Sequence, residues 1–150
     1  MSDLEIRRAV REDIPAIVAM LADDQLGAQR ESPDDLSPYF AAFERLSLDS
    51  NQTQAVAVRE DRVVGTLQLT IIPGLSRRGS TRSIIEGVRI HADERGGGLG
   101  TRLIEWAVDE SRRQNCSLVQ LTSDVTRTDA RRFYERLGFE ASHVGFKLQL

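Results

Sequence analysis

The chain has 150 residues, of which 40% are hydrophobic and 29% are charged, and its formal net charge is −3 at pH 7. This balance is typical of one globular domain over residues 1–150, with enough apolar material for a core, and it argues against a disordered chain. The negative net charge disfavours nucleic acid as a partner, and the sequence contains no apolar run long enough to cross a membrane.

The N-terminal third predicts a strand followed by two helices. Loose alternation of apolar residues favours a strand over residues 4–10. Asp13 can cap the helix that follows, and apolar residues at helical spacing continue this helix to about Asp23. After a polar loop over residues 24–33, a second amphipathic helix is expected over residues 34–48.

Three strands are expected next. Residues 54–59 and 62–72 are rich in β-branched and aliphatic side chains, and the short polar turn between them predicts a hairpin. A polar and basic loop over residues 74–80 separates this hairpin from a third strand over residues 81–91.

The C-terminal half alternates helices and strands. A glycine-rich turn over residues 93–98 precedes an amphipathic helix over residues 99–114, and a strand follows over residues 117–122. A short helix is expected over residues 128–137, and the tail 140–150 is expected to form one or two final strands. These elements predict an α/β (α+β) fold, with a mixed, mostly antiparallel sheet of six to seven strands flanked by about four helices.

The glycine-rich turn carries the strongest functional pattern. Between a strand and a helix, glycines expose consecutive backbone N–H groups at the positive end of the helix and let an anion approach closely. The residues expected to bind phosphate are Arg95, Gly96, Gly97, Gly98, Leu99, Gly100 and Thr101. The triphosphate-binding and dinucleotide-binding glycine patterns are both absent from the sequence. A tight strand-to-helix turn also needs glycine, so the glycines alone leave a purely structural role open.

This segment resembles the pyrophosphate loop of the GNAT superfamily of N-acetyltransferases, which reads Arg/Gln-x-x-Gly-x-Gly/Ala. Arg95, Gly98 and Gly100 match every fixed position of that loop. The resemblance implies acetyl-CoA as cosubstrate and no metal. It also implies that the backbone of Val88 and Ile90 binds the pantetheine arm like an added strand, and that a backbone N–H of this strand stabilises the oxyanion.

A second segment, residues 130–139, resembles the closing helix of the same superfamily, Ala-x-x-Phe-Tyr-x-x-x-Gly-Phe. With the order of elements, the resemblance extends from about Leu4 to the C-terminus. It implies that Tyr134 is the general acid that protonates the leaving thiolate, although its helical spacing also fits a core residue. Arg127 stands where many relatives carry Asn, so Arg127 or Thr126 is expected to contact the cofactor instead.

Glu86 is the candidate general base that removes a proton from the acceptor amine, directly or through water. A carboxylate within an apolar strand is costly to bury without a purpose. Alternation places Glu86, Val88 and Ile90 on one face of the strand unless a bulge intervenes. The alternative is an edge carboxylate that faces solvent or pairs with Arg89 or Arg82.

The single cysteine, Cys116, rules out an internal disulfide, and the two histidines disfavour a metal site. A covalent route through Cys116 is the alternative chemistry, but a small buried core residue is the preferred interpretation. The N-terminus has no signal-peptide pattern, so a cytoplasmic location is expected.

Three arginines, Arg77, Arg78 and Arg82, precede or begin the strand that contains Glu86. They are candidates for binding an acidic or phosphorylated acceptor, as in the amino-sugar phosphate and aminophosphonate branches of the superfamily. A solvated basic loop is the alternative.

The predicted function is the transfer of an acetyl group from acetyl-CoA to a primary amine of a small molecule, by direct attack in a ternary complex. The alternatives are a CoA-binding regulatory or interaction module without turnover, acetylation of a protein or peptide amine, and a basic-loop binder of nucleic acid. Neither nucleic acid nor membrane is an expected partner. A homodimer is possible, with the final strands and the second helix as contact surfaces.

Overall fold

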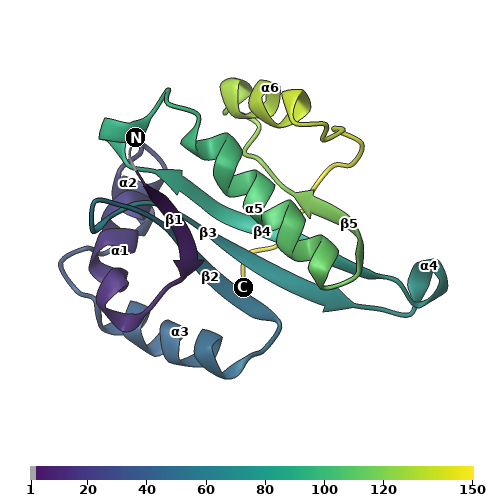
Figure 1. Cartoon of the computed structure of the whole chain (residues 1–150), viewed down its shortest axis with the longest axis horizontal. Helices are drawn as coiled ribbons and strands as arrows, with labels where there is room; N and C mark the ends of the chain where they lie inside the picture. The colour runs from purple at the N-terminus through teal and green to yellow at the C-terminus, as the bar shows by residue number, and fades with distance from the viewer. Residues whose placement is uncertain (1–2) are drawn as a thin grey trace.

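The computed structural model describes residues 3–150, in which five strands form one sheet with the order β1-β2-β3-β4-β5 (Figure 1). Neighbouring strands are antiparallel except β4 and β5, which are parallel. The strands are β1 (Leu4–Arg8), β2 (Gln52–Arg59), β3 (Arg62–Pro73), β4 (Thr81–Ile90) and β5 (Cys116–Leu121). The prediction of a mixed, mostly antiparallel sheet is therefore confirmed.

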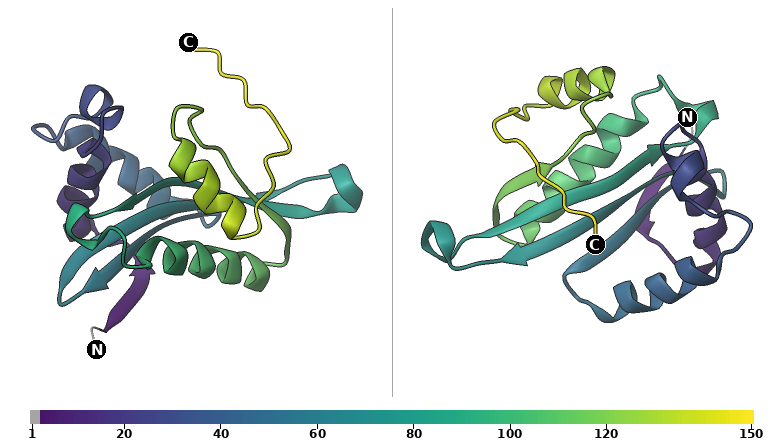
Figure 2. Two further views of the ribbon diagram at one scale, coloured as in Figure 1. Left: turned by 90° about the horizontal axis from the view of Figure 1, so that it is seen from above. Right: turned by 180° about the vertical axis from the view of Figure 1, so that it is seen from behind.

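The helices cover both faces of this sheet, with α5 on one face and α1 and α3 on the other (Figure 2). Two of the helices, α2 and α4, are single turns of four residues. The helices are α1 (Ile14–Ala22), α2 (Gly27–Arg30), α3 (Ser37–Leu48), α4 (Ser76–Gly79), α5 (Leu99–Arg113) and α6 (Thr128–Arg136). The four longer helices match the four predicted ones, and the two single turns lie in segments that were expected to be loops.

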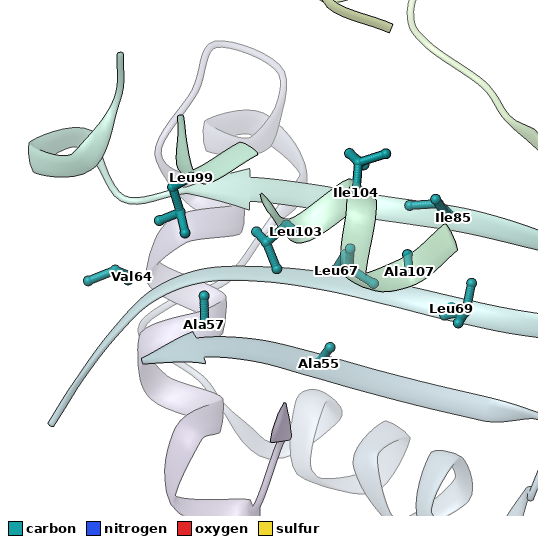
Figure 3. Packing of buried hydrophobic residues seen from close by; sticks show 10 residues of the cluster. All are labelled: Ala55, Ala57, Val64, Leu67, Leu69, Ile85, Leu99, Leu103, Ile104 and Ala107. Atoms are coloured by element: carbon teal, nitrogen blue, oxygen red, sulfur yellow. The ribbon is translucent and has the colours of Figure 1, made fainter. Parts of the chain in front are cut away.

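Alternating side chains of the central strands form two apolar layers. Ala55, Ala57 and Leu67 point toward α5 and are completely buried there (Figure 3). Val56 points to the opposite face and packs with Val18 of α1. Burial on both faces explains why the central strands are rich in aliphatic side chains, and it fixes the register of the strands that position the candidate site.

A β-bulge interrupts β4 between Glu86 and Arg89. Thr66 of β3 pairs with Arg89 and Gln68 pairs with Glu86, so two residues of β4 stand opposite one residue of β3. Gly87 has φ +61°, a left-handed backbone conformation that glycine adopts without strain. The bulge therefore places Glu86 and Arg89 on the same face of the sheet.

The bulge also separates Glu86 from the two residues with which simple alternation grouped it. Val88 and Ile90 pack into the layer beneath α5, whereas Glu86 pairs with Gln68, which faces the opposite side. Glu86 therefore lies on the opposite face of the sheet from Val88 and Ile90, because the extra residue reverses the alternation of side chains after Gly87.

The parallel strands β4 and β5 stay together over only part of their length. Their pairing runs from Thr81 with Cys116 to Ile85 with Leu121. Beyond Ile85, the edge of β4 that faces β5 has no strand partner within residues 3–150. Backbone groups of the bulged half of β4 are thus available for other partners.

The predicted count of six to seven strands is wrong, because the tail 140–150 forms no strand in the described structure. Every residue of this tail is exposed, and Figure 2 shows it leading away from the sheet. A strand needs a paired neighbour to satisfy its backbone, and the tail contacts none within the described chain.

No helix within residues 3–150 has the length and apolar character that a bilayer-crossing helix requires. The cytoplasmic location stays a prediction.

Asp13 connects β1 to α1, although its side chain does not cap the helix as expected. Its carboxylate accepts hydrogen bonds from Arg7 at 2.7 and 3.2 Å and from the Val10 N–H at 2.8 Å. Burial opposes ionisation of Asp13, but these three bonds outweigh it and hold its pKa below the usual value. The ionised carboxylate therefore stabilises the start of α1.

Replacing Asp13→Asn is expected to lower the free energy of unfolding by about 1.5–3 kcal/mol at pH 7, because charge-assisted hydrogen bonds are lost. The folded-state pKa is depressed, so the advantage of the wild type is present above about pH 4 and disappears as the pH falls through that pKa. Urea unfolding at pH 7 and pH 3 measures both effects, with the exposed neighbour Glu12→Gln as control. Equal stability of the Asn and Gln variants would contradict the assignment.

Candidate active site

The loop between β4 and α5 brings the predicted phosphate-binding residues to one helix end. Gly96 and Gly98 have φ values of +83° and +82°, in the left-handed region that favours glycine. Gly98 occupies the N-cap position of α5, so the free N–H groups of the first helical turn begin there. The positive end of a 15-residue helix therefore faces an exposed glycine loop.

The remaining residues of this loop serve different structural purposes. Leu99 is 2% exposed and packs into the core, so only its backbone is available to a ligand. A Cβ on Gly100 would stand 3.3 Å from the Phe133 ring, so glycine lets α6 pack closely on α5. Thr101 is partly buried in the first helical turn. Gly100 thus joins the two predicted motifs, since Phe133 precedes Tyr134.

Arginine side chains donate hydrogen bonds to the backbone carbonyl groups at the end of β4. The Val88 carbonyl accepts a hydrogen bond from Arg89 at 2.9 Å, and the Ile90 carbonyl accepts one from Arg95 at 3.3 Å. Arg95 also lies 3.5 Å from the carboxylate of Asp23, at the end of α1. A ligand that pairs with the backbone of Val88 and Ile90 would therefore replace side-chain hydrogen bonds that the arginines provide here.

Asp24 joins three distant parts of the chain. Its carboxylate accepts a hydrogen bond from Arg127 at 3.0 Å and lies 3.3 Å from Nε of Arg89, and it also accepts the N–H of Gly27. Burial opposes ionisation, but these partners outweigh it and lower the pKa of Asp24. Two guanidinium groups thus share one carboxylate, and the cluster keeps a net positive charge.

Arg89 is the buried member of this cluster. Its side chain is only 16% exposed, and burial, followed by the neighbouring charge of Arg127, lowers its pKa, although Asp24 opposes both effects. Its buried Nε has no partner with hydrogen-bond geometry in the described structure. A buried donor of this kind is costly unless a ligand or water completes it.

Tyr134 lies on α6 among aromatic side chains. Its ring makes edge contacts with Phe133 and Phe139, at centroid distances of 5.1 and 5.9 Å. Burial raises the pKa of the phenol above its usual value, and the positive charges of Arg89 and Arg127 partly offset this rise. Tyr134 is therefore both a partly buried packing residue and a protonated donor beside the arginine cluster.

Glu86 is exposed on a polar strip of the sheet. Gln68, its partner on β3, donates to Gln52 at 2.9 Å, and Thr70 donates to the same Gln52 oxygen at 2.8 Å. Arg89 stands on the same face beyond the bulge. No ion pair joins Glu86 to an arginine within residues 3–150, so of the two arrangements considered as alternatives to a base, the carboxylate that faces solvent is the one present. The role of Glu86 as a base stays a prediction.

The three arginines expected to bind the acceptor are not brought together. Arg77 and Arg78 lie in α4 at the tip of the β3–β4 hairpin, which Figure 1 shows at the far end from the glycine loop. Arg82 is a β4 residue on the same face as Glu86, four positions before it. Only Arg82 therefore lies along the strip that contains Glu86.

Cys116 is half-buried at the start of β5, and burial raises the pKa of its thiol. A raised pKa disfavours the thiolate, which is the nucleophilic form. Across residues 3–150, no group of three or more acidic, histidine or cysteine side chains is placed to hold a metal ion. Two surface hollows of about 210 and 750 Å³ lie beside α3 and α1, and neither is lined by Glu86 or Tyr134.

Sequence reasoning missed the roles of Asp24 and Arg89 in this cluster. The sequence did contain a sign of the pairing of Arg89, since an arginine between Val88 and Ile90 in an apolar strand requires a carboxylate partner. The sequence could not identify that partner among 23 acidic residues. Arg127 was expected to contact the cofactor, and the structure shows it paired with Asp24. Its contact with the cofactor stays a prediction.

Comparison with known proteins gives relatives along nearly the whole chain. An aminoalkylphosphonate N-acetyltransferase of Salmonella typhimurium is 30% identical over 142 residues, which cover 95% of this chain and 88% of that one. A glucosamine 6-phosphate N-acetyltransferase of Trypanosoma brucei brucei is 37% identical over 89 residues, or 59% of this chain and 58% of that one.

A crystal structure described as a transcriptional regulator from Bacillus halodurans C-125 is 43% identical, with a TM-score of 0.94, and the match covers 99% of this chain and 100% of that one. The acetyltransferase (GNAT) family matches residues 15–139, which include the glycine loop, Glu86 and Tyr134. The resemblance carried by residues 95–100 and 130–139 is thereby confirmed, and the chain belongs to the acetyltransferase (GNAT) family.

Proposed function

We propose that the protein transfers an acetyl group from acetyl-CoA to the primary amine of a small molecule that also carries an anionic group. The observation that carries this proposal is the position of one helix end, one bulged strand and one tyrosine beside each other. Gly96 and Gly98 form the exposed loop that leads into the N-terminus of α5. Gly100 packs against Phe133, which precedes Tyr134 on α6. Membership in an acetyltransferase family supports the reaction class.

The chain's own residues fit the two parts of CoA that need most recognition. The N–H groups of residues 96–101 and the Arg95 guanidinium suit a pyrophosphate. The unpaired edge of β4 from Glu86 to Ile90 suits the amide groups of the pantetheine arm, which can pair with it like an added strand. Acetyl-CoA supplies the activated thioester.

Glu86 and Tyr134 would then handle the protons of the transfer. Glu86 accepts a proton from the acceptor ammonium or amine, directly or through water, so that the nitrogen lone pair can attack the thioester carbonyl carbon. A C–N bond forms and the C–S bond breaks. Tyr134 donates its phenolic proton to the departing sulfur, and a backbone N–H of the Val88 strand stabilises the carbonyl oxygen.

Arg89 is the favoured partner for the anionic group of the acceptor. It shares a face with Glu86 and is largely buried, and its Nε lies 3.3 Å from the Asp24 carboxylate without making a hydrogen bond. Two of the relatives have names that specify amines bearing a phosphonate or a phosphate. Arg82 lies on the same strip and would bind the far end of a longer acceptor. Arg77 and Arg78 stand too far along the hairpin to share this site.

A CoA-binding regulatory module is the second candidate function, because the 43% identical structure carries the description of a transcriptional regulator. Both functions predict that acetyl-CoA binds. They differ in turnover, so thiol release from acetyl-CoA with a panel of amines distinguishes them. A panel that includes peptide N-termini also tests acetylation of a protein amine.

Acetyl-CoA at about 100 times its Kd is expected to stabilise the folded protein by about 2.7 kcal/mol. Gly98→Glu should abolish the corresponding rise in Tm, because a carboxylate would stand against the pyrophosphate. Gly98→Gln has the same size and the same backbone strain, and it should keep a measurable rise. Differential scanning calorimetry measures all three. A wild-type rise in the Glu variant would refute the placement of the pyrophosphate.

Tyr134→Phe is expected to lower kcat by about 100-fold to 10,000-fold, the range typical of a lost general acid. The phenyl ring preserves the contacts with Phe133 and Phe139, so the rise in Tm with acetyl-CoA should be unchanged. Steady-state thiol release at saturating substrates measures kcat. Unchanged kcat in the folded variant would leave Tyr134 with a packing role alone.

The wild type should prefer the anionic member of matched acceptor pairs, such as glucosamine 6-phosphate over glucosamine and 2-aminoethylphosphonate over ethanolamine. Arg89→Gln should reduce kcat/KM for the anionic member about 10-fold to 100-fold, the value of one charge-assisted hydrogen bond, with less effect on the neutral one. Arg77→Gln, at the hairpin tip, is the matched control. Loss of the preference in Arg77→Gln alone would place the anion site in the hairpin loop instead.

A further inference from the structure

The carboxylate of Glu86 has a neutral amide as its neighbour on the sheet. Gln68 of β3 pairs with Glu86 of β4 across the antiparallel ladder. The Cβ atoms of directly opposed residues lie about 5 Å apart, so two long polar side chains at these positions can reach a common ligand. Glu86 is exposed and Gln68 is half-buried. An acceptor amine that reaches Glu86 therefore meets the amide of Gln68 as well.

Two residues hold the amide of Gln68 in one orientation. Its Nε2 donates to Oε1 of Gln52 at 2.9 Å, and the hydroxyl of Thr70 donates to the same oxygen at 2.8 Å. These two donors occupy both lone pairs of that oxygen. Arg8 donates to the backbone carbonyl of Gln52 at 3.3 Å, which joins this network to β1. Gln52 thus fixes which end of the Gln68 amide is the donor.

The fixed amide offers its oxygen, and not its nitrogen, to a ligand at Glu86. The oxygen and the nitrogen leave the amide carbon in different directions, so the bond to Gln52 on β2 turns Oε1 of Gln68 away from β2. The strand on the other side of β3 is β4, which carries Glu86. Within residues 3–150 no side chain donates a hydrogen bond to this oxygen. A free amide oxygen beside a carboxylate is suited to bind a group with several N–H donors.

An acceptor amine is such a group. Most alkylamines arrive as ammonium ions at neutral pH, because their pKa is close to the lysine value of about 10.4, and an ammonium ion has three donors and no acceptor. Glu86 loses its charge when it takes the proton, so its attraction for the nitrogen weakens at that moment. The amide of Gln68 does not change its protonation state, so it can hold the nitrogen both before and after the proton moves.

We propose that Gln68 binds the acceptor ammonium together with Glu86, and that Gln52 is the positioning residue that orients the Gln68 amide. This role depends on the proposed function, in which a primary amine is acetylated. One N–H of the ammonium bonds to Glu86, which takes that proton directly or through water, and a second N–H bonds to Oε1 of Gln68. The neutral amine keeps its bond to Gln68 while its nitrogen attacks the thioester. A neutral amide also adds no second negative charge that would hold the proton on Glu86.

Two variants of similar size separate an accepting oxygen from a packing role. Gln68→Met removes both polar atoms, and it should raise the KM for 2-aminoethylphosphonate and for glucosamine 6-phosphate about 10-fold to 100-fold, the value of one hydrogen bond to a charged group. The KM for acetyl-CoA should be unchanged. Gln68→Glu keeps an accepting oxygen, and the amide of Gln52 can rotate to donate to it, so the KM for both amines should stay close to the wild-type value. Equal losses in the two variants, or no loss in Gln68→Met, would overturn the role of Gln68.

Variants of Gln52 test the orientation of the amide. Gln52→Glu still accepts from Gln68 and Thr70, so the KM for both amines should stay close to the wild-type value, whereas Gln52→Met frees the Gln68 amide and should raise it. Gln54→Met is the matched control, because Gln54 pairs with Gln68 in the same row across the strands but donates to Thr66 at 2.9 Å. A KM that rises as much in Gln54→Met as in Gln68→Met would contradict a specific role of Gln68.

Calorimetric titration of the same two amines into the protein saturated with CoA measures binding without turnover. The wild type and Gln68→Glu should bind them about 10-fold to 100-fold more tightly than Gln68→Met. Absence of thiol release from the wild type would refute acetyl transfer, and this titration would still decide the role of Gln68. A wild type that releases thiol, with a Gln68→Met variant that binds both amines equally well, would refute the role of Gln68 alone. The rise in Tm with acetyl-CoA verifies that each variant is folded.

Discussion

The left-handed backbone of Gly87 is the constraint on which the candidate site depends. By inserting one residue into β4, it turns Glu86 and Arg89 toward one face and leaves Val88 and Ile90 packed beneath α5. The bulge follows directly on the last pair between β4 and β5. The same short segment therefore ends the parallel pairing, frees a backbone edge and presents two side chains of opposite charge.

The electrostatics of the site depend on a second, distant constraint, the carboxylate of Asp24. It lies just after α1, whose start is fixed by the bond between Asp13 and Arg7, and it holds Arg89 and Arg127 together. One carboxylate neutralises only one of the two guanidinium groups. The remaining charge opposes the rise in the pKa of Tyr134 that burial causes, so the packing of α1 affects the acidity of a phenol on α6.

A feature could be predicted from the sequence when the residues that determine it lie close together along the chain. The glycine loop and the Phe133-Tyr134 helix were recognisable because glycine, helix ends and close packing impose their demands within a few residues. A bulge in this strand was considered, but the sequence could not decide between a bulged and a regular strand, because the same residues are compatible with both. The partnership of Asp24 with Arg127 was out of reach because it joins positions 103 residues apart.

The tail was the largest error of structure, and its cause is physical. Alternation in residues 144–150 indicates a strand correctly as a local preference, but a strand exists only where an edge receives it. Within residues 3–150 the sheet has unpaired outer edges at β1 and β5, and the bulged half of β4 is also unpaired on the side of β5. In the proposed complex with acetyl-CoA, the bulged edge of β4 receives an extended partner from outside the chain, the pantetheine arm. The five strands of the described chain thus leave free at β4 the backbone edge that the proposed cofactor site requires, and residues 140–150 pair with none of the free edges.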